Sequence, residues 1–154
     1  MRRLLSVVGL ALIALVTATG AVQAASQGNI KLVLPSTDLN PCTAELVDSV
    51  VKIHILVTST ANANSVSGTF HMNFSLKGVG QTSGALYTGS ESDNEPFTAS
   101  LENDQAVVPI VNRFIMTTAG GGNNWVVRLI GHLTVNANGE VTASFAKQAD
   151  EVCR

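Results

Sequence analysis

Cysteines, aromatic residues and clusters of basic charge are scarce in this sequence. Its 154 residues include two cysteines, one tryptophan and one tyrosine. The lack of a basic cluster argues against nucleic acid or an anionic membrane surface as the partner. No segment after Ala25 has sustained helical periodicity, so we do not expect a helical fold.

The first residues have the pattern of an export signal. Arg2 and Arg3 precede an apolar run over residues 4–16, and Val22-Gln23-Ala24 supplies small residues at the two positions that a signal peptidase inspects. We expect residues 1–24 to be removed as a signal peptide, with no stable membrane insertion because the apolar run is short. This predicts a secreted or periplasmic protein.

The remaining segment, residues 25–154, is long enough for one domain with a real core. Without Arg2 and Arg3 it has seven Lys and Arg against eleven Asp and Glu, a formal charge of −4. In an exported chain, Cys42 and Cys153 predict a disulfide that encloses nearly the whole domain. Closing a loop of this size stabilises a domain by about 4–5 kcal/mol.

Short segments rich in β-branched residues, separated by turn residues, predict an all-β fold. We expect about eight antiparallel strands. An up-and-down barrel and a two-sheet sandwich both fit this pattern, and the disulfide favours the barrel because it would join the first and last strands. The expected strands cover residues 29–34, 45–59, 66–77, 83–89, 96–102, 105–118, 125–136 and 140–149.

Alternating apolar residues predict the register of two hairpins. In the first, a turn centred between Asn62 and Ala63 would pair Ile53 with Met72 and place His54 directly opposite His71.

The second hairpin is expected to have a three-residue loop, 137–139, in which Gly139 adopts a left-handed conformation. That loop would pair Val135 with Val141 and His132 with Ser144.

Two polar segments are expected to be loops. One is the glycine-rich stretch at 120–124, which lacks phosphate-loop spacing. The other is the acidic segment 91–96, which Pro96 would end. Its carboxylates could bind calcium, but they lack the spacing of a dedicated twelve-residue calcium loop.

Segments NPCTAELV, HMNFSLKGVG and NANGEVTA, with the terminal Cys153, resemble a group of small exported bacterial β proteins without an established function. The resemblance implies an exported β domain with paired cysteines, and it brings no known chemistry. The sequence departs from the group at Ala44, where the group has a glycine suited to a positive φ. The matching residues are Asn40, Pro41, Cys42, Thr43, Glu45, His54, His71, Gly84, Tyr87, His132, Thr134, Asn136, Ala137, Asn138, Gly139, Glu140 and Cys153.

The three histidines are the first candidates for a site. A cross-strand pair of His54 and His71 would place their Cβ atoms about 4.5–5.5 Å apart, close enough to chelate zinc or copper with a third ligand. If the last strand paired with the strand of His54, His132 would lie about 9–10 Å from His54, which is too far for easy coordination. We therefore expect no metal and no cofactor.

Catalytic patterns are absent. No serine has the strand-turn-helix setting of a catalytic nucleophile, and nothing in the spacing of Glu45 and Asp48 requires a glycosidase pair. Tyr87, Trp125 and Arg128 could line a pocket mouth or simply pack with polar tips outward.

The resulting hypothesis is a non-enzymatic β domain that binds a small or extracellular ligand through His54, His71, His132 and Tyr87. One alternative is a structural or surface-interaction module that meets an envelope component. Another is an enzyme that uses the histidine-bearing polar face.

Overall fold

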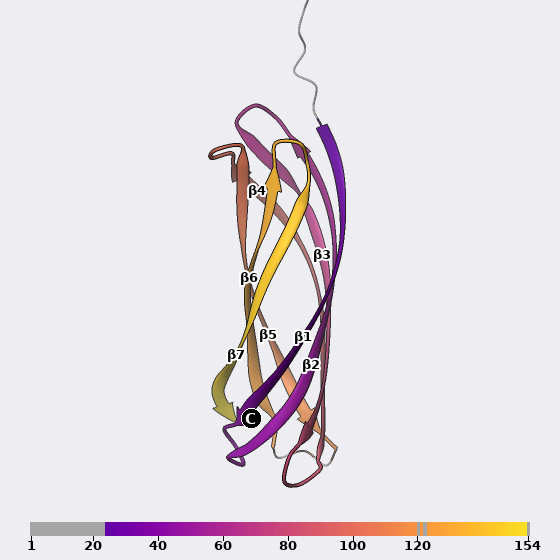
Figure 1. Ribbon diagram of the computed structural model, residues 1–154, viewed down its shortest axis with the longest axis vertical. Coiled ribbons are helices and arrows are strands. Elements are labelled where there is room, and N and C mark those ends of the chain that lie inside the picture. The colour runs from indigo at the N-terminus through magenta and orange to yellow at the C-terminus, as the bar shows by residue number, and fades with distance from the viewer. Residues whose placement is uncertain (1–23, 120, 122, 154) are drawn as a thin grey trace, which may run out of the picture.

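The protein is an elongated, nearly closed barrel of seven antiparallel strands that neighbour one another in chain order (Figure 1). The computed structural model describes residues 24–119, 121 and 123–153, so the expected signal peptide, apart from Ala24, lies outside the described residues. The predicted all-β barrel is confirmed. Among the described residues there is no helix of the length and apolarity needed to cross a membrane. The strands are β1 (Ala24–Asn40), β2 (Glu45–Ala61), β3 (Ser65–Gly80), β4 (Leu86–Ser100), β5 (Gln105–Thr118), β6 (Trp125–Asn136) and β7 (Val141–Cys153).

Alternation of side chains along the strands builds the core. In β2, every second residue from Val47 to Val57 is buried, whereas the residues between them are exposed or half-buried. The barrel interior is therefore occupied by a hydrophobic core, and outer faces and strand seams are left for binding. The largest fully buried side chains are Trp125, Tyr87, Ile53, Ile55, Met72, Leu76, Met116, Leu129 and Leu133.

The seam between β1 and β7 closes by packing and by a disulfide. Gly28 approaches Val141 so closely that a Cβ added at Gly28 would lie 3.0 Å from the Cβ of Val141. At the other end of the seam, Cys42 and Cys153 form the predicted disulfide, with their Cα atoms 5.4 Å apart. The bond joins the turn after β1 to the last residue of β7, as expected for a barrel.

A second seam separates β4 from β5. The two strands pair only at Tyr87↔Thr118 and Thr88↔Thr117, although β4 pairs with β3 along its whole length. The β4–β5 hairpin also closes at its turn through the bridge between Glu102 and Gln105. Between these two points the sheet has open edges.

The acidic segment 91–96 is part of a strand, so its assignment to a loop was wrong. The expected strands 83–89 and 96–102 belong to one strand, β4, which is why there are seven strands and not eight. Pro96 lies within β4, opposite Thr69. Proline has no N–H to donate. It is tolerated there because β5 does not pair with this part of β4, so no backbone hydrogen bond is lost on that edge. Accordingly, the three strand prolines, Pro35, Pro96 and Pro109, all lie on strands that border a seam.

The β2–β3 register differs from the prediction by two residues. Ile53 pairs with Phe74 and His54 faces Asn73, so His54 and His71 are not directly opposite each other. The reason lies in the turn, where the side-chain oxygen of Asn62 accepts hydrogen bonds from the N–H groups of Asn64 and Ser65. These bonds centre the turn between Ala63 and Asn64. The two apolar sets still share the core face because a shift of two residues preserves the alternation.

The β6–β7 hairpin has the predicted register. Val135 pairs with Val141 and His132 with Ser144, and Gly139 has a φ of +82° in the three-residue loop. The glycine-rich stretch lies in the connection between β5 and β6, although its residues 120 and 122 fall outside the described residues.

Candidate functional site

The residues of the NPCTAE segment hold the end of the barrel together. Asn40 is fully buried; its side-chain oxygen accepts a hydrogen bond from the N–H of Cys42, and its side-chain nitrogen donates one to the hydroxyl of Tyr87. The carboxylate of Glu45 accepts hydrogen bonds from the N–H groups of Thr82 and Ser83. These polar groups are engaged within the fold, so the segment has a structural role.

Tyr87 lies in the core, away from the histidines. Its side chain is 1% exposed and packs edge-on against Trp125, with ring centroids 4.8 Å apart. Of the predicted site residues, Tyr87 is therefore the one whose ring is too deeply buried to contact a ligand at the surface.

The histidines lie on outer faces of the barrel. His54 on β2 is half-buried, with its Nε2 3.0 Å from the side-chain oxygen of Asn29 on β1. His71 on β3 is also half-buried, and its Nε2 lies 3.0 Å from the side-chain nitrogen of Asn73. His132 on β6 is exposed.

His54 and His71 share a face, and His132 does not. His54 pairs with Asn73, two residues from His71, so the two histidines are diagonal neighbours. β7 neighbours β6 and lies beside β1, not β2, so the arrangement considered for His132, in which the last strand pairs with the strand of His54, does not occur. No group of three or more His, Cys, Asp or Glu able to hold a metal occurs among the residues that the structure describes.

Three lysines surround the two histidines. Lys31 on β1 pairs with His54, and Lys52 lies two residues from His54 on the same side of β2. Lys52 pairs with Ser75, two residues from Lys77 on β3. We call this set the basic face; it consists of Lys31, Lys52, His54, His71 and Lys77.

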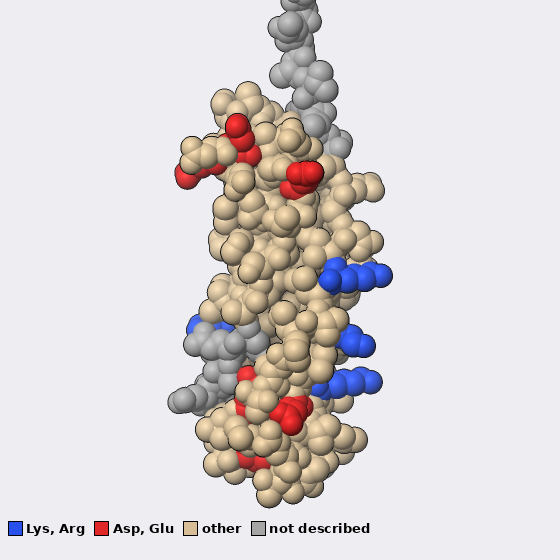
Figure 2. All heavy atoms as spheres, viewed as in Figure 1, with Lys and Arg blue, Asp and Glu red and all other residues tan. Residues whose placement is uncertain are grey.

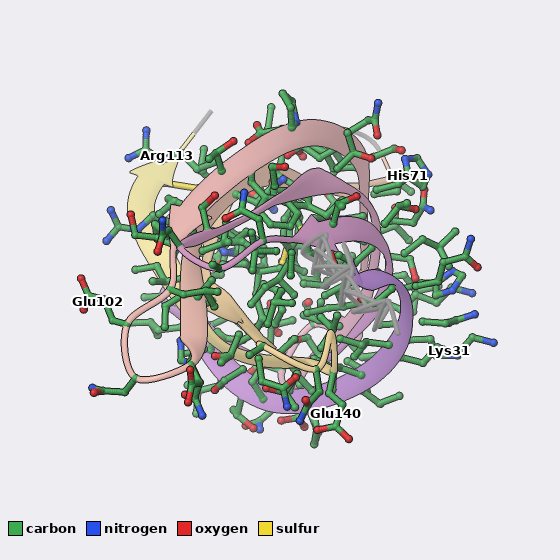
Figure 3. The ribbon with its side chains drawn as sticks, turned by 90° about the horizontal axis from the view of Figure 1, so that it is seen from above. Lys31, His71, Glu102, Arg113 and Glu140 are labelled. Carbon is green, nitrogen blue, oxygen red and sulfur yellow. A yellow bond between two sulfur atoms is a disulfide. The ribbon has the colours of Figure 1, made fainter. Side chains whose placement is uncertain are left out.

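The lysines of the basic face form a diagonal row. Each step, from Lys31 to Lys52 and from Lys52 to Lys77, crosses one strand and moves two residues along it, a separation of about 7–8 Å. All three lysines are exposed, and none forms an ion pair with a described residue. Figure 3 shows Lys31 and His71 projecting outward from one side of the barrel, with Arg113 on the other.

A shallow groove runs through the basic face. It has a volume of about 330 Å³ and includes Lys31, Lys52 and His54 among its lining residues. The side chain of Val33, which is 61% exposed, adds an aliphatic surface between the lysines. The groove can therefore offer both positive charge and apolar contact.

Among the described residues, no acidic side chain lies between the three lysines, although one borders their row. In Figure 2, the carboxylates in view gather toward the two ends of the elongated body, whereas basic side chains project from its right-hand side, around the middle. The nearest acid on the outer face of β2 is Asp48, four residues from Lys52 along the chain and a diagonal neighbour of Lys77, which pairs with Val50. Hydrogen bonds from Thr37 and then Gln81 lower the pKa of Asp48, so this carboxylate already has hydrogen-bond donors from its neighbours.

The three lysines cannot be grouped from the sequence alone because they are far apart in the chain. Lys52 and Lys77 were visible at polar positions of alternating strands, but only the register of β1 and β3 against β2 brings them together with Lys31. The basic face is thus a product of the fold rather than of a basic sequence cluster.

Comparisons with protein-family models, with curated proteins and with solved structures give no match.

Proposed function

We propose that this protein is a non-enzymatic binding module that recognises a linear anionic polymer, such as a polysaccharide with carboxylate or phosphate groups, through its basic face. The observation that carries this proposal is the diagonal of three exposed lysines, Lys31, Lys52 and Lys77, with no acidic side chain between them. Positive charges at regular spacing attract a ligand whose negative charges also repeat.

The shape of the surface supports an extended ligand rather than an enclosed one. The barrel interior is occupied by core side chains, so the hypothesis of a small ligand held inside it gains no support. The groove, in contrast, lies at the surface and continues across β1, β2 and β3. A polymer lying across these strands would contact lysines on each of them, with His54 and Asn73 as hydrogen-bonding groups.

The expected location supports the same class of ligand. The disulfide is consistent with an oxidising, extracytoplasmic compartment. We further propose secretion or export to the periplasm, on the basis of the signal sequence, and membership in the group of exported β proteins that the sequence resembles. An anionic component of the cell envelope is the partner that such a module would meet.

The test is a binding titration with polygalacturonate, with inorganic polyphosphate and with neutral dextran, at about 0.01 M and 0.15 M salt. We expect binding to the two polyanions that weakens with salt, and none to dextran. Lys52→Gln should weaken binding about two- to fivefold, because one exposed charge pair contributes about 0.4–1 kcal/mol.

The matched control is Arg113→Gln, which removes the same charge from the opposite side of the barrel. It should leave binding unchanged. Equal losses for the two variants, equal binding of dextran, or no binding at low salt would overturn the proposal.

A further inference from the structure

The seam between β4 and β5 contains a hollow that the basic face does not use. It has a volume of about 470 Å³ and is lined by Glu91, Asp93, Val111, Asn112 and Arg113. The hollow exists because the two strands pair only at Tyr87↔Thr118 and Thr88↔Thr117. Side chains, rather than backbone hydrogen bonds, therefore join the strands at this level.

Two carboxylates stand side by side in this hollow. Glu91 and Asp93 lie two residues apart on β4, so both project from the face that carries Tyr87 and Phe97. Burial, and next the negative charge of Asp93, raise the pKa of Glu91. A bound cation would therefore relieve the repulsion between the two carboxylates.

A buried amide provides an independent sign of a missing ligand. Asn112 is 4% exposed, and its side-chain nitrogen donates a hydrogen bond to Asp93. Its side-chain oxygen is buried and has no hydrogen-bond partner among the described residues. Buried carbonyl oxygens are rarely left unpaired, since they lose their bonds to water without replacement. The unpaired acceptor belongs to a side chain that lines the same hollow as the two carboxylates.

We propose that this hollow binds a hard divalent cation, with Ca²⁺ as the best fit, through the carboxylates of Glu91 and Asp93 and the amide oxygen of Asn112. Carboxylate and amide oxygens are the ligands that Ca²⁺ takes in proteins, and water completes its shell. With only three protein ligands the affinity should be that of extracellular calcium modules, a Kd of about 0.1–1 mM. Arg113 lines the same hollow, and the repulsion between its positive charge and the cation is the main effect that opposes binding.

Calorimetric titration of the full, disulfide-bonded protein with calcium chloride tests this site. We expect saturable binding in the range given above, and Asp93→Asn should weaken it at least about tenfold by removing one ligand charge. The control is Glu95→Gln, which removes the same charge two residues further along β4, outside the lining of the hollow. It should leave the Kd within about twofold of the original.

A second measurement keeps the proposal testable if Asp93→Asn fails to fold. Backbone amide chemical shifts of the unchanged protein, recorded during the calcium titration, should move most at residues 91–93 and 111–113. Absence of saturable binding, equal binding by Asp93→Asn, or shifts confined to other strands would each overturn the site.

Discussion

The side-chain nitrogen of Asn40 donates a hydrogen bond to the hydroxyl of Tyr87, 3.1 Å away, and so joins the end of β1 to the start of β4. Both residues are buried in the described structure. The bond links the turn segment that contains Cys42 to β4, so Asn40 and Tyr87 form one structural joint near the disulfide.

Asn40→Ala should lower the free energy of unfolding by about 1–3 kcal/mol, since it removes the hydrogen-bond acceptor of the Cys42 N–H in the turn and leaves buried partners unpaired. Tyr87→Phe, which removes only the hydroxyl, should lower it by about 1 kcal/mol. Urea unfolding measures both. The control, Asn94→Ala on the exposed side of β4, should change stability little; a loss there as large as at Asn40 would contradict the structural role of this joint.

Ala44 has a φ of +55°, in the left-handed region that glycine adopts without strain. Ala44→Gly should therefore stabilise the protein by about 0.5–1 kcal/mol. This net gain is the backbone strain that glycine relieves minus the entropy that its greater freedom adds to the unfolded chain. Ala99→Gly, in β4, should destabilise it instead. Comparison of urea midpoints for the two variants decides the matter, and destabilisation by Ala44→Gly would refute the strained turn.

Removal of the disulfide should have a large effect because it closes a loop between residues 111 apart in the sequence. The paired change Cys42→Ser with Cys153→Ser is expected to lower the free energy of unfolding by about 4 kcal/mol through the gain in unfolded-chain entropy. Urea unfolding of this variant, alongside the original protein with and without reductant, provides the measurement. An effect below about 1 kcal/mol would mean that the barrel closes by packing alone.

Low pH should reduce the stability of the fold, in part because Glu45 becomes protonated. The N–H of Ser83, followed by the hydroxyl of Ser83 and the N–H of Thr82, lowers the pKa of Glu45, against the opposing effect of desolvation. Because the folded-state pKa is depressed, this contribution to stability is present above the ordinary pKa of a glutamate and is lost as the pH falls through the lowered folded-state pKa.

Glu45→Gln should accordingly show a shallower decline of melting temperature with acid than the original protein. Asp48, whose pKa is also lowered, remains in the variant, so part of the decline should persist. Identical acid profiles for the two proteins would show that Glu45 does not contribute.

The two hairpins show which features of this fold are readable from sequence. At Gly139, the need for a positive φ and the alternation of Val135 and Val141 leave one loop length, and the register was predicted correctly. Between β2 and β3, alternation cannot distinguish two registers that differ by two residues. There the hydrogen bonds that Asn62 accepts in the turn determine the register, and a pattern of apolar residues does not reveal them.

The seam between β4 and β5 was beyond sequence reasoning for a similar reason. The residues of 91–96 have the composition of a loop, yet they form a strand because β3 pairs with all of them. A clue was nevertheless present at Asn112, a polar residue at an inward position between Ile110 and Phe114 in a strictly alternating strand. Charge at an open strand edge also discourages pairing with other chains, which gives the acidic residues of β4 a protective role.

The most direct test of the proposed function is to map the surface that polygalacturonate contacts. Backbone amide chemical shifts of the isotope-labelled protein should move most on β1, β2 and β3 around Lys31, Lys52 and Lys77, and Lys52→Gln should reduce these movements. Shifts confined to β5 and β6, or no shifts at low salt, would contradict the assignment of binding to the basic face.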